Sequence, residues 1–221
     1  MANEEEDEMA NQRVNTVLID RNEDRQTQIN RTVVDSGIDI TGFFGFYILG
    51  GSQLRESRTD FNYLFLASGA YKGTELTKPY SSFVGTGQSI ITTPVTIKGT
   101  ASASFENITF FQDHNNPSYL VLIEEGAKVS FTNCTFIRRS KQELREAGGI
   151  LTSNNSFIEV NSAGASDLAT FTNCKFIQRA DSGATEVFRR AAANGTVYLT
   201  GCVNQTTLPY GAAASLVGGN I

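Results

Sequence analysis

The chain has 221 residues, of which 40% are hydrophobic, and this length and composition fit one soluble domain with a sizeable core. Its formal net charge is -5 at pH 7, and the acidic residues concentrate near the N-terminus while the remainder is close to balanced. The sequence shows neither a basic stripe nor an apolar run long enough to span a membrane, which argues against nucleic-acid and membrane partners.

The first 60 residues differ from the rest of the chain. Residues 1–12 are acidic and aperiodic, the reverse of a signal peptide, so we expect them to be disordered in isolation and the protein to be made and kept in a cytosol. Residues 13–60 are too apolar for a loop, and they predict an extended arm that leads to a short strand-rich cap near residues 31–50. We therefore divide the chain into an attachment segment over 1–60 and a repeat domain over 61–221.

Residues 61–137 predict the first strands of the repeat domain. A buried strand within 63–71 leads into a turn, and Gly85 and Gly87 predict a second turn. The apolar run 119–123 predicts a strand that is buried on both faces. Glu124 and Glu125 stand beside Gly126, and we expect them to end that strand.

A short pattern recurs along this domain. The stretch 130–138 returns almost unchanged as 170–178, a weaker copy covers 104–111, and a decayed copy covers 198–205. The matching residues of successive copies are Phe105, Phe131, Phe171 and Leu199. They are separated by 26, 40 and 28 residues, which is typical of repeat architectures. The longer middle step predicts an insertion, and within it a serine cap and a closing glycine predict a short helix over 140–148.

Within each copy, a single residue separates two strands. Phe131 and Cys134 are three residues apart, whereas a strand places residues on one face only at even separations. Asn133 must therefore break the alternation, and asparagine and glycine are the residue types that tolerate a left-handed backbone. If the coils stack, like residues form columns. The predicted columns are Phe105, Phe131, Phe171 and Leu199; Ile108, Cys134, Cys174 and Cys202; Phe110, Phe136 and Phe176; and a polar bend ladder of Asn107, Asn133 and Asn173.

The tail over 211–221 is small and uncharged. It makes a poor solvent-facing cap for an open solenoid end, so we expect it to fold over that end or to dock against a copy of itself. The cysteines fit buried free thiols, and a disulfide between Cys134 and Cys174 is the alternative if their coils are adjacent.

The repeat and the first coil together resemble the pectin-lyase-like right-handed parallel β-helix, over roughly residues 61–205. The resemblance implies an all-β fold, a single-stranded right-handed parallel β-helix of about five or six coils with an extended N-terminal arm. At the level of the fold, the chain is also similar to β-helical virion proteins of tailed phages, which include trimeric capsid decoration proteins and tail spikes.

These resemblances imply a function without catalysis. We expect a trimeric capsid decoration, or cement, protein that stabilises the head, is assembled in the host cytoplasm and has the major capsid protein as its partner. An anchoring arm and the lack of an active site and of a distal receptor domain favour this hypothesis. The alternative is a short tail spike or receptor-binding protein that recognises a surface glycan, and a polysaccharide-cleaving enzyme is a remote alternative.

Catalytic and metal sites are not predicted. The carboxylates beyond residue 100 form no pair that repeats at stacked positions, and neighbouring Glu124 and Glu125 would face opposite sides of a strand. Three distant cysteines and one histidine do not provide the four closely spaced ligands of structural zinc. We therefore expect neither a cofactor nor a metal.

Two sets of residues are candidates for partner contacts. Outward apolar residues that stack along one side predict the trimer interface: Phe111, Ile137 and Ile177. Basic residues that follow two copies of the repeat should share one edge of the solenoid, either solvated or receiving an acidic partner such as a neighbour's arm. The residues of this second set are Arg138, Arg139 and Arg179, with Glu4, Glu5, Glu6, Asp7 and Glu8 as the acidic arm.

Overall fold

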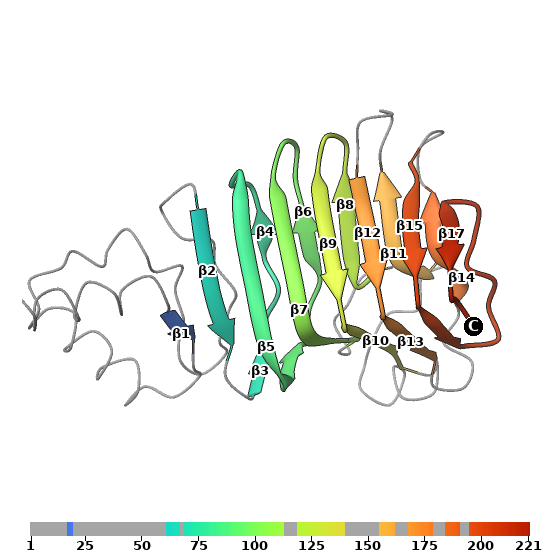
Figure 1. Cartoon of the computed structure of the whole chain (residues 1–221), viewed down its shortest axis with the longest axis horizontal. Helices are drawn as coiled ribbons and strands as arrows, with labels where there is room; N and C mark the ends of the chain where they lie inside the picture. Colours follow the sequence, from blue (N-terminus) through green and yellow to red (C-terminus); the bar gives the residue numbers. More distant parts are fainter. Residues whose placement is uncertain are drawn as a thin grey trace, which may run out of the picture.

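The structure is a computed structural model that describes residues 17–19, 61–66, 69–112, 119–139, 155–161, 168–178, 184–190 and 195–221. The described part is all-β, every strand pairing in it is parallel, and the strands form two sheets (Figure 1). None of the described segments forms a helix long and apolar enough to cross a membrane. The predicted helix over 140–148 and the cap near 31–50 lie outside the described residues.

The larger sheet has 12 strands, and we call it the large sheet. Its first face follows the order β1-β2-β5-β7-β9-β12-β15-β17, and beyond a bend its second face contains β3, β10, β13, β16 and the distal parts of β5 and β7. The strands are β1 (Val17–Ile19), β2 (Phe61–Leu66), β3 (Gly69–Tyr71), β5 (Tyr80–Ile91), β7 (Ser102–Phe111), β9 (Lys128–Thr132), β10 (Thr135–Arg138), β12 (Leu168–Thr172), β13 (Lys175–Gln178), β15 (Val197–Thr200), β16 (Val203–Gln205) and β17 (Ala214–Gly218).

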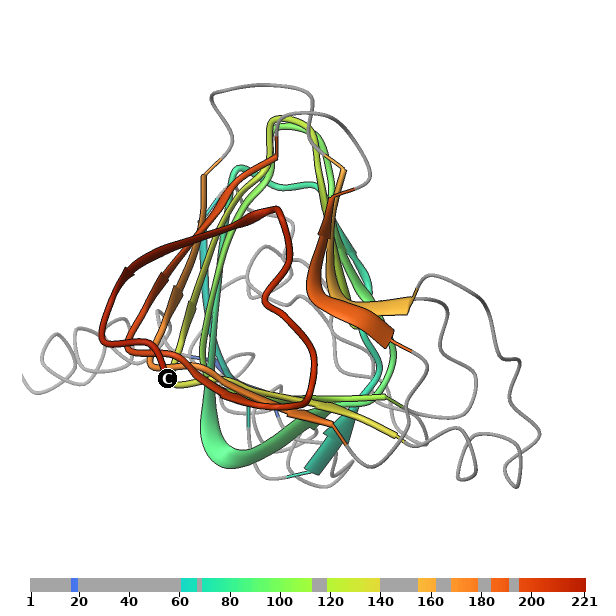
Figure 2. The ribbon, with the colours of Figure 1, turned by 90° about the vertical axis from the view of Figure 1, so that its right-hand side faces the viewer.

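The second sheet has five strands in the order β14-β11-β8-β6-β4, and we call it the small sheet. Viewed along the stack, the coils have a triangular outline whose sides are the two faces of the large sheet and the small sheet (Figure 2). The small sheet consists of β4 (Glu75–Leu76), β6 (Val95–Ile97), β8 (Val121–Glu124), β11 (Asn155–Asn161) and β14 (Ala184–Arg190).

The predicted columns are confirmed by the strand register. Phe131 pairs with Phe105 on one side and with Phe171 on the other, and the ring centroids lie 5.1 and 4.7 Å apart. In the neighbouring column, Phe136 stacks between Phe110 and Phe176 at 4.9 and 5.2 Å. The two columns meet edge to face, a favourable arrangement for aromatic rings. The core of the solenoid is therefore an aromatic ladder.

The bend between the two faces depends on a left-handed residue in each coil. Asn107, Asn133 and Asn173 have φ angles of 55°, 52° and 52°, and Gly201 continues the series at 64°. The Asn133 backbone amide donates to the Thr172 carbonyl oxygen at 3.0 Å, which ties adjacent coils together at the bend. A Cβ added at Gly201 would lie 2.4 Å from Asn173 Oδ1, so a side chain at 201 would require the Asn173 side chain to shift.

The long middle step of the repeat is one coil with an insertion. The strands β9 and β12 pair directly, with Phe131 opposite Phe171, so no extra coil separates them. Between them the chain passes through β10 and β11, and the additional residues lie outside the described part. This outcome confirms the insertion predicted from the spacing.

One predicted strand differs in its burial. The strand β8 alternates buried Val121 and Ile123 with partly exposed Leu122, so the prediction that 119–123 is buried on both faces is wrong. The reason is that the outer face of the small sheet is open to solvent at this strand. As expected, β8 ends at Glu124, and Gly126 makes the turn that follows with a φ of 85°.

The tail forms the last coil. Tyr210 packs its ring against Phe176 and Phe188, and β17 pairs with β15. The C-terminal segment, dark red in Figure 2, crosses the end of the stack of coils. The tail thus folds over the end of the solenoid, one of the two arrangements expected for it. Leu216, which continues the column of Phe171 and Leu199, stays 56% exposed.

Candidate binding groove

The outer side of the large sheet carries a row of hydroxyl groups. Ser82, Ser104, Ser130 and Thr170 face one another in register on β5, β7, β9 and β12. Each stands one residue before an inward phenylalanine, so the alternation that buries the ring turns the hydroxyl outward. Ser104 Oγ donates a hydrogen bond to Ser82 Oγ at 2.9 Å.

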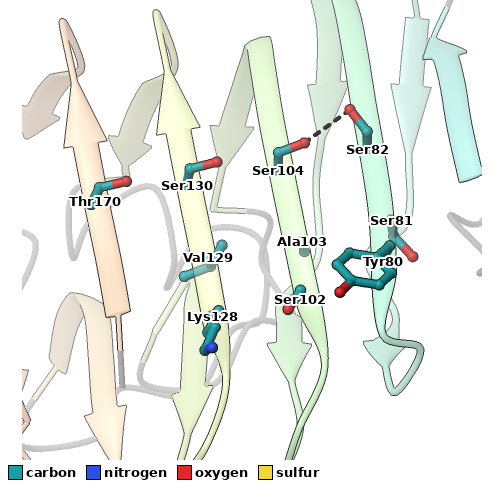
Figure 3. A pocket seen from close by; sticks show the side chains of 10 residues that line it. All are labelled: Tyr80, Ser81, Ser82, Ser102, Ala103, Ser104, Lys128, Val129, Ser130 and Thr170. Carbon is teal, nitrogen blue, oxygen red and sulfur yellow. Dashed lines mark hydrogen bonds between the residues drawn. The ribbon is translucent and has the colours of Figure 1, made fainter. Parts of the chain in front are cut away.

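An open groove with a volume of about 280 Å³ lies across these strands. Small serine side chains form its floor, while Tyr80 and Lys128 stand beside them in the row of Ser102 (Figure 3). Tyr80 is 58% exposed, and its hydroxyl end points toward β7. No carboxylate is among the described residues that line the groove, and Lys128 is the one charged side chain among them.

Three acidic side chains of the small sheet, Glu75, Glu124 and Glu159, lie in ion pairs. Lys98 Nζ lies 3.2 Å from Glu75 and 3.8 Å from Glu124, and the hydrogen bond with Glu75 raises the lysine pKa. Arg189 lies 3.4 Å from Glu159 on the adjacent strand. Lys98 is shared by Glu75 and Glu124, and Arg189 pairs with Glu159, so these side chains form an outer row of opposite charges on neighbouring coils.

The two described arginines predicted for one edge, Arg138 and Arg139, differ in burial. Arg138 is fully buried and donates from Nη1 to the Ser156 carbonyl oxygen, so the prediction that it lies at a solvated, partner-binding edge is wrong. The alternation that buries Cys134 and Phe136 continues to Arg138, and burial lowers the pKa of its guanidinium to about 10. Arg179 and the acidic residues Glu4, Glu5, Glu6, Asp7 and Glu8 lie outside the described residues.

Arg139 has the outward position that was expected. It is partly exposed, its guanidinium lies 5.1 Å from the centroid of the Phe111 ring, and its backbone amide donates to Gln112 Oε1. Phe111, Ile137 and Ile177 stack in register on the outside of the second face, each partly exposed. The structure therefore brings together the residues predicted for the trimer interface, and Arg139 lies against one of them.

The cysteines are buried free thiols. Each Sγ donates to the carbonyl oxygen of the column residue in the preceding coil, for example Cys174 to Phe131 at 3.5 Å. The hydrogen bond with Cys134 raises the pKa of Cys174, and the bond with Cys174 raises that of Cys202. In the described part of the chain, no three histidine, cysteine or acidic side chains are grouped so that they could hold a metal ion.

The groove was missed at the sequence level, although part of its signal was visible. Ser104, Ser130 and Thr170 precede the column residue in three copies of the repeat. Tyr80 lies in a coil without the bend asparagine, where the register shifts between Val84 and Ser89.

No protein-family model, no curated protein and no solved structure matches this chain.

Proposed function

We propose that this protein is a non-catalytic structural protein of a phage virion, a homotrimeric decoration protein related in fold to right-handed β-helical virion proteins. The observation that carries the proposal is the apolar stripe of Phe111, Ile137 and Ile177, in register on three successive coils and only partly buried within one chain. A side-by-side trimer would bury three copies of this stripe around its axis.

The arrangement of charge is consistent with a structural role. Glu75, Glu124 and Glu159 of the small sheet lie in ion pairs, and no described carboxylate lines the groove on the large sheet. In this proposal the segment before β2 anchors the trimer to the major capsid protein, and β1 runs parallel to the first strand of the solenoid. The alternative of a short tail spike or receptor-binding protein shares the trimer and differs in its place and copy number on the virion.

The test is the solution mass of the full chain, together with its binding to empty phage heads. We expect a mass three times that of the 24.0 kDa chain and saturable binding to the heads. Ile137→Lys should give a folded monomer, because it places a charge in each copy of the stripe. Thr135→Lys is the matched control, because Thr135 is an outward residue of the same strand and outside the stripe.

Two results would contradict the proposal. A wild-type chain that stays monomeric at micromolar concentration removes the trimer. A trimer that ignores heads but is found at the tail tip of the virion replaces the decoration role with the tail-spike alternative.

A further inference from the structure

The two ends of the solenoid differ in how the column of core residues ends. At one end, the register continues the column beyond Phe83 with Leu64 of β2 and Val17 of β1 (Figure 1). At the other end, the column stops at Leu216 of β17, which is 56% exposed, although Leu199 in the coil beneath it is fully buried. The C-terminal end of the stack therefore presents an open end of the core.

The edge of β17 is open as well. Within the described residues, β17 pairs with β15 and with no other strand. Native proteins protect such an edge with lysine, proline or a bulge, because its unpaired N–H and C=O groups accept another strand. The strand has neither charge nor proline, and its register shift against β15 falls beyond Leu216, so Ala214, Ser215 and Leu216 form a regular edge. This edge offers main-chain hydrogen bonds beside the exposed apolar side chain.

This end is a preformed surface, because hydrogen bonds fasten the tail to the coil beneath it. The Asn220 side chain accepts from the Cys202 backbone amide at 2.9 Å and donates to the Leu199 carbonyl oxygen at 3.0 Å. The exposure of Leu216 thus belongs to an ordered coil. A partner that docks on an ordered surface loses less conformational entropy than one that must first order it.

The lack of charge at this end selects the kind of partner. The sequence has no charged residue from 191 to 221. A charged partner would find no opposite charge there. In a two-fold interface each residue lies near its own copy, so a charged surface repels itself and a neutral one does not. With Val217 63% exposed beside Leu216, the surface is neutral and apolar, and it suits a second copy of the same end.

From these observations we propose that the C-terminal end of the solenoid binds the same end of a second copy about a two-fold axis. The two β17 edges pair antiparallel, and Leu216 and Val217 of both copies are buried between the ends. A head-to-tail stack is disfavoured, because β1 already occupies the edge of β2 at the other end. The inference does not depend on the trimer, since the stripe of Phe111, Ile137 and Ile177 lies on a side of the stack.

The first test measures mass against concentration. The contact contains few large apolar side chains, so we expect it to be weaker than an interface of standard size. In sedimentation equilibrium of the full chain from about 5 to 500 µM, the mass should double with a midpoint on the order of 100 µM. Val217→Lys should abolish the doubling, because the two-fold axis brings the two lysines together. Leu216→Ser should raise the midpoint by about tenfold.

The matched control is Tyr198→Lys. It replaces an exposed apolar residue on the outer side of β15, one strand before the end, and it should double as the wild type does. Circular dichroism and melting of all variants check that each is folded.

Ile137→Lys separates this inference from the proposed function. That variant should be monomeric at the lowest concentration and dimeric at the highest. A wild-type chain that is trimeric and never doubles removes the end contact and leaves the trimer. A wild-type monomer that doubles removes the trimer and leaves the end contact.

The second test measures the arrangement of the two copies. A nitroxide label is attached through Ser215→Cys in the Ile137→Lys chain, where no trimer adds further distances and the native cysteines are buried. Pulsed electron paramagnetic resonance should give a separation below about 25 Å, because the two β17 strands are neighbours. A head-to-tail stack would place the labels roughly 40 Å apart, the height of the strands from β1 to β17. That longer separation, the absence of doubling, or doubling of Val217→Lys as in the wild type would each overturn the inference.

Discussion

The large and the small sheet of the same solenoid are stabilised in different ways. The large sheet stacks identical residues, so that phenylalanine lies on phenylalanine and the bend asparagines repeat. The small sheet pairs unlike residues, with Thr96, Leu122, Glu159 and Arg189 in one outer row. In the large sheet, each inner side chain must pack against the same type of residue in the next coil. In the small sheet, it is sufficient that the inner residues are apolar and that the outer charges are complementary.

The largest expected effect tests the aromatic ladder. Phe131→Ala removes a fully buried ring that touches two stacked and two edge-on neighbours, so we expect a loss of about 3–5 kcal/mol in the free energy of unfolding. Phe111→Ala, on the outer side, should cost about 1 kcal/mol or less. Urea unfolding of both variants measures the difference. Equal losses would show that the ladder is not the main support of the large sheet.

The second prediction concerns the thiol column in alkali. Cys174 and Cys202 have raised pKa values in the folded chain, so above the ordinary thiol pKa the unfolded chain releases protons that the folded chain retains. Stability is fully present below that pKa and falls as pH rises above about 9, by up to about 1.4 kcal/mol per pH unit for each thiol.

The measurement is urea unfolding at pH 8, 9 and 10 for the wild type and for a Cys174→Val, Cys202→Val double variant. The double variant should lose less stability over this range, because tyrosines and lysines titrate in both proteins and the two thiols in only one. Parallel curves would contradict the prediction.

The third prediction tests the buried arginine. Arg138→Ala removes a charged donor from the Ser156 carbonyl oxygen, and we expect a cost of about 1.5–3 kcal/mol. Arg139→Ala, one residue further and partly exposed, should cost less than about 1 kcal/mol. Arg138→Gln introduces glutamine, the residue type found at the register partner Gln178 in the next coil. This variant should lose less stability than Arg138→Ala. A smaller effect at 138 than at 139 would mean that the desolvation cost of the buried guanidinium offsets its hydrogen bond to Ser156.

The difference between the sheets also explains what the sequence predicts. The phenylalanines, cysteines and asparagines of the large sheet repeat in kind as well as in position, and spacing alone places them in columns. In the small sheet, inner positions such as Val121, Ile158 and Phe188 share only apolar character, so no motif marks the register.

The candidate site could be predicted only in part. The alternation that turns Cys134 and Phe136 inward also turns Arg138 inward. The prediction of a basic edge overlooked this, because it grouped the arginines by charge and not by the direction of their side chains. The hydroxyl row follows from the residue before each column phenylalanine. Tyr80 lies beside the hydroxyl row only because β5 pairs with β7. The repeat does not reveal this pairing, because Gly85 and Gly87 replace the bend asparagine in that coil.

The fourth prediction tests the bend that joins the two faces of the large sheet. Asn133→Ala places alanine at a φ of 52°, where an L residue is strained, and should cost about 1–2 kcal/mol. Asn133→Gly is the matched control, because glycine adopts this conformation without strain and Gly201 occupies the same position between β15 and β16. Thermal melting of the two variants shows the difference. A glycine variant as unstable as the alanine variant would mean that the asparagine side chain, rather than its backbone conformation, supports the bend.

The smallest effect is expected for the ion pair of the small sheet. A double-mutant cycle of Glu159→Gln and Arg189→Gln should give a coupling of about 0.2–1 kcal/mol, because the two side chains are partly exposed and 3.4 Å apart. The coupling should shrink in about 1 M salt, where the screening length is about 3 Å. A coupling as large as the loss in Phe131→Ala would mean that charge stabilises the small sheet as strongly as stacking stabilises the large one. A small, salt-sensitive coupling means that the outer row mainly selects which strands pair, while the inner apolar residues supply the stability.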